Sequence, residues 1–124
     1  MIMLDTHVAV ALYEGRSAGL SARALRRLDR EPTTISPAVL LELELLHEIK
    51  RIRLPARPIA DHLRERLSIA VASESFAEVT GAALAFGFTR DPFDRLIAGH
   101  AQLNRATLLT FDTQLHRHYA DALA

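Results

Sequence analysis

Short apolar runs alternate along the chain with longer segments in which apolar residues recur every three or four positions. Runs of this kind, only three to five residues long and bounded by polar residues, are typical of buried strands. The third of them is rich in β-branched residues, although its pattern also allows a continued helix. The predicted strands are Met1–Leu4, Thr33–Ile35, Ser68–Ala72 and Ala106–Thr110.

The segments between these strands carry helix start and stop signals. Serine and Ser-Pro or Asp-Pro pairs can cap helices, while Gly15 and Pro32 end them. Strands that alternate with helices predict an α/β domain with a mainly parallel sheet and helices on both faces. The predicted helices are Thr6–Glu14, Ser21 to about Arg30, Ser36-Pro37 to about Arg51, Ile59–Leu67, Phe76–Phe86, and Asp91-Pro92 to about Asn104.

Composition excludes several classes of protein. A chain of 124 residues with 49% hydrophobic and 24% charged residues matches one ordinary globular domain, residues 1–124. Cysteine is absent, which excludes disulfide frameworks, zinc-thiolate sites and catalytic thiols. There is neither a signal-peptide pattern nor a run of roughly 18 apolar residues. We therefore expect a soluble cytoplasmic protein with no membrane partner.

Several acids occupy positions where a solvated carboxylate is not expected. Asp5 and Asp112 follow the first and last predicted strands, and ligands of open α/β sheets collect at that edge. Glu42 is predicted to face the core, where a carboxylate needs a cation, a hydrogen-bond network or a functional pocket. We favour the pocket, and we assign Glu44 and Glu48 to the outer face. The apolar helical neighbours of Glu42 are Ala38, Val39, Leu45 and Leu46, with Ile49 continuing the stripe.

The Asp-Pro-Phe-Asp segment contains two acids with different expected roles. Asp91 suits a helix cap, with Pro92 at the next position, although it is also a candidate auxiliary acid. Asp94 shares a helical stripe with Ile97, Ala98 and Ala101, which predicts that it points inward. Carboxylates that converge need a cation to stay ionised, and Mg²⁺ or Mn²⁺ prefers such oxygen donors. The six histidines show no matching ligand spacing.

Four motifs, in this order, resemble the PIN-domain ribonucleases, specifically the VapC-like toxins of type II toxin-antitoxin pairs. They are Leu4–His7, Ile35–Pro37 followed by Glu42, Asp91–Ala98 with Ala101, and Leu109–Asp112. The resemblance covers nearly the whole chain and implies a PIN-like three-layer fold. The family's four acids, which would be both catalytic and metal-binding, fall on Asp5, Glu42, Asp94 and Asp112. Thr89 stands where many relatives carry a histidine.

The resemblance also implies an activity and partners. We expect an Mg²⁺- or Mn²⁺-dependent endoribonuclease that cleaves RNA phosphodiester bonds, forms homodimers and is inhibited by a cognate small antitoxin protein. Thr6 and Thr110 are candidates for positioning water or phosphate, with helix capping as the simpler role. Candidate contacts to the RNA backbone are Arg16, Arg23, Arg26, Arg27, Arg51 and Arg53.

Two other classes of function remain as alternatives. A PIN-fold module could bind RNA or a protein partner without catalysis, but the complete set of four acids argues against it. A phosphoaspartate receiver or phosphatase would also place acids at strand ends. The phosphatase would need a second aspartate where His7 stands, and the receiver a lysine after a late strand, whereas Lys50 is the only lysine.

Overall fold

The computed structural model describes residues 1–124 and contains one five-stranded parallel sheet in the order β3-β2-β1-β4-β5. Strand β1 lies at the centre and pairs with β2 on one side and β4 on the other. This architecture confirms the predicted α/β class. The strands are β1 (Ile2–Leu4), β2 (Thr33–Ile35), β3 (Ala70–Val71), β4 (Thr107–Leu109) and β5 (Ala122–Leu123).

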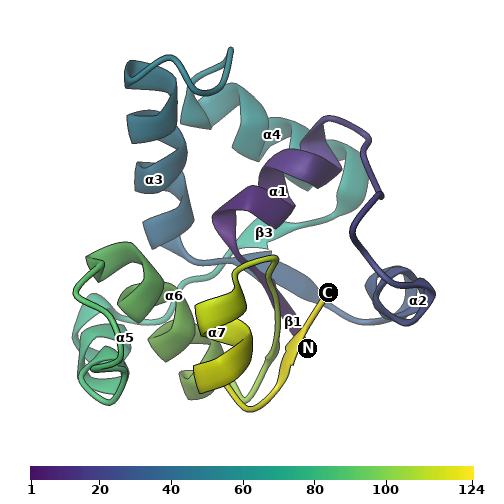
Figure 1. Ribbon diagram of the computed structural model, residues 1–124. Coiled ribbons are helices and arrows are strands. Elements are labelled where there is room, and N and C mark those ends of the chain that lie inside the picture. The colour runs from purple at the N-terminus through teal and green to yellow at the C-terminus, as the bar shows by residue number, and fades with distance from the viewer.

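Seven helices flank the sheet. In Figure 1, α1, α3 and α4 lie together in the upper half of the view, α5, α6 and α7 gather at the lower left, and α2 stands apart on the right. No helix is long and apolar enough to cross a membrane. The helices are α1 (Thr6–Tyr13), α2 (Ala22–Arg30), α3 (Pro37–Glu48), α4 (Ala56–Leu67), α5 (Phe76–Ala83), α6 (Pro92–Leu103) and α7 (Thr113–His118).

Several predicted boundaries were wrong by about one helical turn. Helix α3 ends at Glu48 and not near Arg51, because Lys50 adopts a left-handed backbone conformation with φ of 62°. Helix α4 begins at Ala56, so Pro58 lies in its first turn, where the missing proline N–H breaks no helical hydrogen bond. Helix α5 ends three residues before Phe86. The short elements α7 and β5 were not predicted.

The apolar stripe assigned to α3 was partly wrong. Its buried face consists of Val39 and Leu43, whereas Leu45 is 39% and Ile49 61% exposed. Glu42 is half-buried at the margin of the core. Glu44 is not a free outer-face residue, because its Oε1 accepts a hydrogen bond of 2.9 Å from the N–H of Ala56 at the start of α4.

Helices α5 and α6 approach each other closely at Gly99. A Cβ added there would lie 2.6 Å from the backbone nitrogen of Ala83 and 2.7 Å from its Cα. Backbone atoms cannot move aside as a flexible side chain could, so the two helices depend on glycine at this crossing. Gly81, on α5, has nothing within 4 Å of an added Cβ.

Alanine should therefore have opposite effects at these two glycines. Gly99→Ala should lower the free energy of unfolding by roughly 1–3 kcal/mol through overpacking. Gly81→Ala should raise it by about 0.5–1 kcal/mol, since glycine within a helix is unfavourable. Urea denaturation of the two variants provides the measurement, and a stabilising Gly99→Ala would contradict the close packing.

Candidate active site

The central strands deliver polar side chains to one edge of the sheet, at their carboxyl ends. Asp5 follows β1, Ser36 follows β2 and Thr110 follows β4. The backbone N–H of Asp5 donates to the carbonyl of Leu109 at 2.9 Å, which holds the ends of β1 and β4 side by side. This edge is where ligands bind in open parallel sheets, and the predicted site residues gather here.

Asp5 is held in a fixed orientation by hydrogen bonds to both of its carboxylate oxygens. Oδ1 accepts from the backbone N–H of Thr6 at 2.8 Å, and Oδ2 accepts from Thr110 Oγ1 at 2.6 Å. Asp5 is only 5% exposed, so burial raises its carboxyl pKa. The two hydrogen bonds act in the opposite direction, and the negative charge of Asp112 adds to the increase.

Glu42 reaches the same edge from α3. Its Oε1 accepts a hydrogen bond from the Thr6 hydroxyl. Partial burial raises the pKa of the Glu42 carboxyl, and the charges of Asp5 and Asp91 raise it further, while the Thr6 hydrogen bond lowers it. Three acids contributed by three different segments therefore lie within electrostatic range of one another.

The two threonines of the site donate hydrogen bonds to acidic side chains. Thr6 donates to Glu42, and Thr110 donates to Asp5 while its hydroxyl accepts from the backbone N–H of Asp112 at 3.0 Å. Their hydroxyl protons are thus already engaged. In this arrangement the threonines orient the carboxylates, a role different from the water or phosphate positioning considered from the sequence.

Asp94 lies at the electrostatic centre of the cluster. Its carboxyl pKa is raised to about 7, first by burial and then by the charges of Asp91, Asp5, Asp112 and Glu42. Its helical neighbours Ile97, Ala98 and Ala101 are fully buried, as the stripe predicted. The other three acids of the expected set, together with Asp91, therefore lie close enough to Asp94 to raise its pKa.

Asp91 and Asp112 each cap a helix. The side chain of Asp91 accepts from the N–H groups of Phe93 and Asp94 at the start of α6, at 2.8 and 3.4 Å. Asp112 accepts from Gln114 and Leu115 at the start of α7, at 2.8 and 3.0 Å. The capping role expected for Asp91 is confirmed. Thr89, which replaces the histidine of many relatives, accepts from the N–H of Asp91 at 3.1 Å.

The donor set of this edge suits a hard divalent cation. None of the five acids forms an ion pair with an arginine, lysine or histidine. In this structure no group of three or more histidine, aspartate or glutamate side chains is gathered tightly enough to hold a metal ion. The carboxyl pKa is raised at Asp5, Glu42 and Asp94, first by burial and then by neighbouring acids, and carboxylate oxygens without an ion-pair partner are suitable ligands for Mg²⁺ or Mn²⁺.

The structure does not bring all the candidate arginines to this edge. Arg27 forms an ion pair with Glu31 and donates to Thr107 Oγ1 at 2.8 Å, at the start of β4 and thus at the opposite edge of the sheet. Arg16 pairs with Glu14 in solvent. The other four are solvent-exposed on α2 and on the loop after α3, and they are Arg23, Arg26, Arg51 and Arg53.

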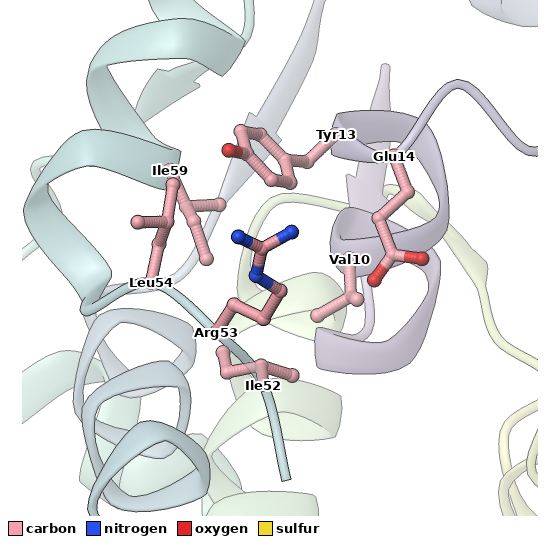
Figure 2. Close-up of a pocket in the computed structure, with 7 residues that line it drawn as sticks. All are labelled: Val10, Tyr13, Glu14, Ile52, Arg53, Leu54 and Ile59. Atoms are coloured by element: carbon pink, nitrogen blue, oxygen red, sulfur yellow. The ribbon is translucent and has the colours of Figure 1, made fainter. Parts of the chain in front are cut away.

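An apolar groove lies away from the acids, between α1 and the segment that leads into α4 (Figure 2). It has a volume of about 550 Å³. The guanidinium of Arg53 projects into it between the apolar side chains, and the Glu14 carboxylate lies at its rim (Figure 2). The apolar lining consists of Val10, Tyr13, Ile52, Leu54 and Ile59.

The raised pKa of Asp94 predicts a pH-dependent stability in metal-free buffer. The carboxyl is protonated more readily in the folded protein, near pH 7, than in the unfolded chain, where its ordinary value is 3.8. The unfolded chain therefore loses this proton first as pH rises, and the free energy of unfolding should fall between pH about 4 and about 7. Asp94→Asn should make this decline shallower.

Thermal or urea unfolding from pH 4 to 8 tests this prediction. Asp5 and Glu42 also have raised pKa values, so the variant should retain part of the decline. An unchanged slope in Asp94→Asn would contradict the placement of Asp94 among the other charges.

Comparison with known proteins agrees with this fold. The family model of the PIN domain matches residues 2–121. The chain resembles the solved structure of VapBC2 from Rickettsia felis bound to a promoter DNA fragment, with 22% identity and a TM-score of 0.68; the match covers 99% of this chain and 96% of that one. It also resembles a toxin-antitoxin complex from Klebsiella pneumoniae, with 19% identity and a TM-score of 0.65; the match covers 100% of this chain and 97% of that one. A third similar structure is DNA-bound VapBC from Salmonella typhimurium, with 21% identity and a TM-score of 0.64; the match covers 98% of this chain and 94% of that one.

Among curated proteins, none matches the sequence. At identities below 25% the structural likeness shows a shared fold, whereas the family match spans nearly the whole chain. The resemblance inferred from the four motifs is confirmed, and the chain belongs to the PIN-domain family.

Proposed function

We propose that this protein is an Mg²⁺- or Mn²⁺-dependent endoribonuclease that acts in the cytoplasm as the toxin of a toxin-antitoxin pair. PIN domains are generally nucleases. The observation that supports the proposal is the convergence of Asp5, Glu42, Asp94 and Asp112, none of which forms an ion pair. Burial, and then the charges of the neighbouring acids, raise the pKa of Asp94 to about 7. Such a cluster is unfavourable for folding and suits metal-assisted hydrolysis.

The proposed mechanism assigns distinct tasks to the residues of the site. Asp5, Glu42, Asp94 and Asp112 would hold the metal, directly or through water. When bound, the metal lowers the pKa of a water molecule and stabilises the charge that develops on the phosphodiester. Thr110 and Thr6 keep the carboxylates of Asp5 and Glu42 oriented. Asp94 must release its proton for binding, so metal affinity should increase toward pH 7.

RNA would contact the exposed arginines through its phosphates. Arg51 and Arg53 follow α3, the helix that carries Glu42, while Arg23 and Arg26 project from α2. We omit Arg27 because its guanidinium is engaged by Glu31 at the opposite edge. Contacts of this type weaken as salt increases and read no base sequence.

A small antitoxin protein is the proposed partner, as the solved VapBC and toxin-antitoxin complexes support. The groove of Figure 2 is a surface suited to such a partner, since it combines apolar side chains with one cation, Arg53. An apolar segment with a nearby carboxylate would complement it.

Homodimerisation remains part of the proposal. Helices α3 and α5 expose large apolar side chains beside one another, because Leu41 (57% exposed) and Phe76 (75% exposed) line the same shallow groove. Contiguous exposed apolar surface is typical of protein interfaces. A second copy of the chain is the occupant that the family resemblance implies.

Cleavage of RNA should require a divalent metal. Purified protein should cut RNA with Mg²⁺ or Mn²⁺ and lose activity in excess chelator, because the clustered carboxylates cannot activate water by themselves. Asp5→Asn should abolish cleavage and relieve growth arrest in a bacterial host while the protein stays folded. Cleavage at full rate in chelator, from preparations in which Asp5→Asn is inactive, would refute the metal mechanism.

The two acids of the Asp91–Asp94 motif should differ in role. Asp91→Asn should retain cleavage and stability because asparagine caps helices about as well, whereas Asp91→Ala should cost roughly 1 kcal/mol of stability. Asp94→Asn removes a charge that the metal needs and should eliminate cleavage while the fold survives. Parallel assays of cleavage and melting test this, and an inactive Asp91→Asn beside an active Asp94→Asn would reverse the assignment.

Measuring RNA binding and RNA cleavage side by side distinguishes a nuclease from the alternative, a binding module without catalysis. A silent module would bind RNA equally well in wild type and in Asp94→Asn and would cut it in neither. The proposed nuclease should bind RNA in both and cut it only in the wild type.

A further inference from the structure

His100 is a fully buried titratable side chain on α6 that the proposed mechanism does not use. It is 0% exposed. Its Nδ1 lies 2.8 Å from Ser36 Oγ, and its Nε2 lies 2.8 Å from Glu74 Oε1. Asn104 Nδ2 donates to the same Glu74 oxygen at 2.6 Å. No spacing in the sequence indicates this cluster, because its hydrogen bonds join residues as far as 64 positions apart.

The directions of these hydrogen bonds follow from the chemistry of the groups. Hydrogen bonds from Asn104 and then His100 lower the pKa of the Glu74 carboxyl, so it is an ionised acceptor. His100 Nε2–H therefore donates to Glu74, and in the neutral ring Nδ1 accepts from the Ser36 hydroxyl. Ser36 Oγ in turn accepts from the N–H of Ala38 at 3.3 Å, as the cap of α3. Both ring nitrogens of the buried histidine are satisfied.

This network connects the two helices that carry site acids. Ser36 begins α3, which bears Glu42, and His100 belongs to α6, which bears Asp94. The two helices pack against each other, with α5 beside α6 (Figure 1). No hydrogen bond or ion pair joins Glu42 to Asp94 directly. Their separation therefore depends on how α3 and α6 are held together.

A serine, a histidine and a glutamate joined in this order also resemble a hydrolytic triad, but the surroundings do not support that chemistry. Acyl transfer needs N–H donors for the developing oxyanion. Pro37 has no N–H, and the N–H of Ala38 is already bound to Ser36 Oγ. Ser36 is only 2% exposed. The cluster is built as a connection between elements.

We propose that His100 is a positioning residue that sets the separation of Glu42 and Asp94 by linking the start of α3 to α6 and to Glu74. The hydrogen bonds in the structure are enough to infer that His100 links the two helices. The effect of this link on cleavage rests on the proposed function. Removing a residue that orients metal ligands without contacting the metal commonly lowers metal affinity or activity by roughly 10- to 100-fold.

The absence of cysteine allows a direct measurement of helix separation. Spin labels on Leu45→Cys of α3 and Gln102→Cys of α6, both exposed, would report their distance by double electron-electron resonance without metal or RNA. Labelled protein is diluted with unlabelled protein, so that distances between labels on two different copies do not contribute. We expect His100→Ala and Glu74→Ala to shift or broaden the distance distribution.

Matched variants distinguish positioning from a general loss of stability. Glu74→Gln keeps an oxygen that accepts from His100 and Asn104, so it should restore the parent distribution. Ile59→Val, in the core of α4, should lower stability without changing the distance. If His100→Ala folds poorly, Glu74→Ala still tests the link, because Glu74 is 31% exposed and its removal leaves no cavity in the core. An unchanged distribution in these alanine variants would overturn the proposal.

Kinetics complete the test with unlabelled protein. His100→Ala and Glu74→Ala should lower kcat for RNA cleavage by roughly 10- to 100-fold at saturating metal with little change in KM, and Glu74→Gln should recover most of it. If the helices move but kcat does not change, the separation that His100 sets has no effect on cleavage, and the catalytic part of the proposal is overturned. If the parent cleaves no RNA, the proposed function fails, whereas the distances still decide whether His100 sets the separation of the helices.

Discussion

The mutual repulsion of acids at the carboxyl edge of the sheet is the constraint on which the site depends. Asp94 experiences the charges of Asp91, Asp5, Asp112 and Glu42, and no cationic side chain pairs with any of them. The fold tolerates this because three of the acids are helix caps. Asp5, Asp91 and Asp112 each accept from backbone N–H groups at the start of a helix, where the helix dipole favours negative charge.

The parallel topology explains why so many helix starts meet at one place. In a parallel sheet every strand ends at the same edge, and the helix that follows it begins there. Helices α1, α3 and α7 start directly after β1, β2 and β4. The amide groups at these starts donate to Asp5 and Asp112, so the helix dipoles offset part of the repulsion between the acids. The fold thus places the acids and the helix starts that stabilise them at one edge of the sheet.

The sequence predicted most of this arrangement, and the failures have physical causes. Asp5, Asp112 and Asp94 were identified from strand ends and helical spacing, which depend only on local order. Glu42 was identified from a stripe whose members Leu45 and Ile49 are in fact exposed. The helix was correctly placed, but which of its apolar residues is buried depends on its packing partners.

Other features were not available from local patterns. The strand β5 and the helix α7 comprise two and six residues, too short for a periodic signal. The link through His100 joins Ser36 and Glu74, which are 64 and 26 positions away from it, and no spacing rule connects them. From the sequence, Thr6 and Thr110 were candidates for positioning water or phosphate, or simple helix caps, and only the geometry shows that their hydroxyls donate to Glu42 and Asp5.

Charged side chains are paired differently at the two edges of the sheet. The chain has equal numbers of basic and acidic residues, 15 of each, so its net charge says nothing about its partners. At the amino edge, Glu31 is neutralised by Arg27 and by the terminal amine of Met1. At the carboxyl edge the acids form no ion pair, and the charge of His7 only partly offsets the raised pKa of Asp5 and Glu42. A negative edge of this kind repels anions. Under the proposed function, a phosphodiester would therefore approach Asp5 and Asp94 together with a cation that the carboxylates and the phosphate share.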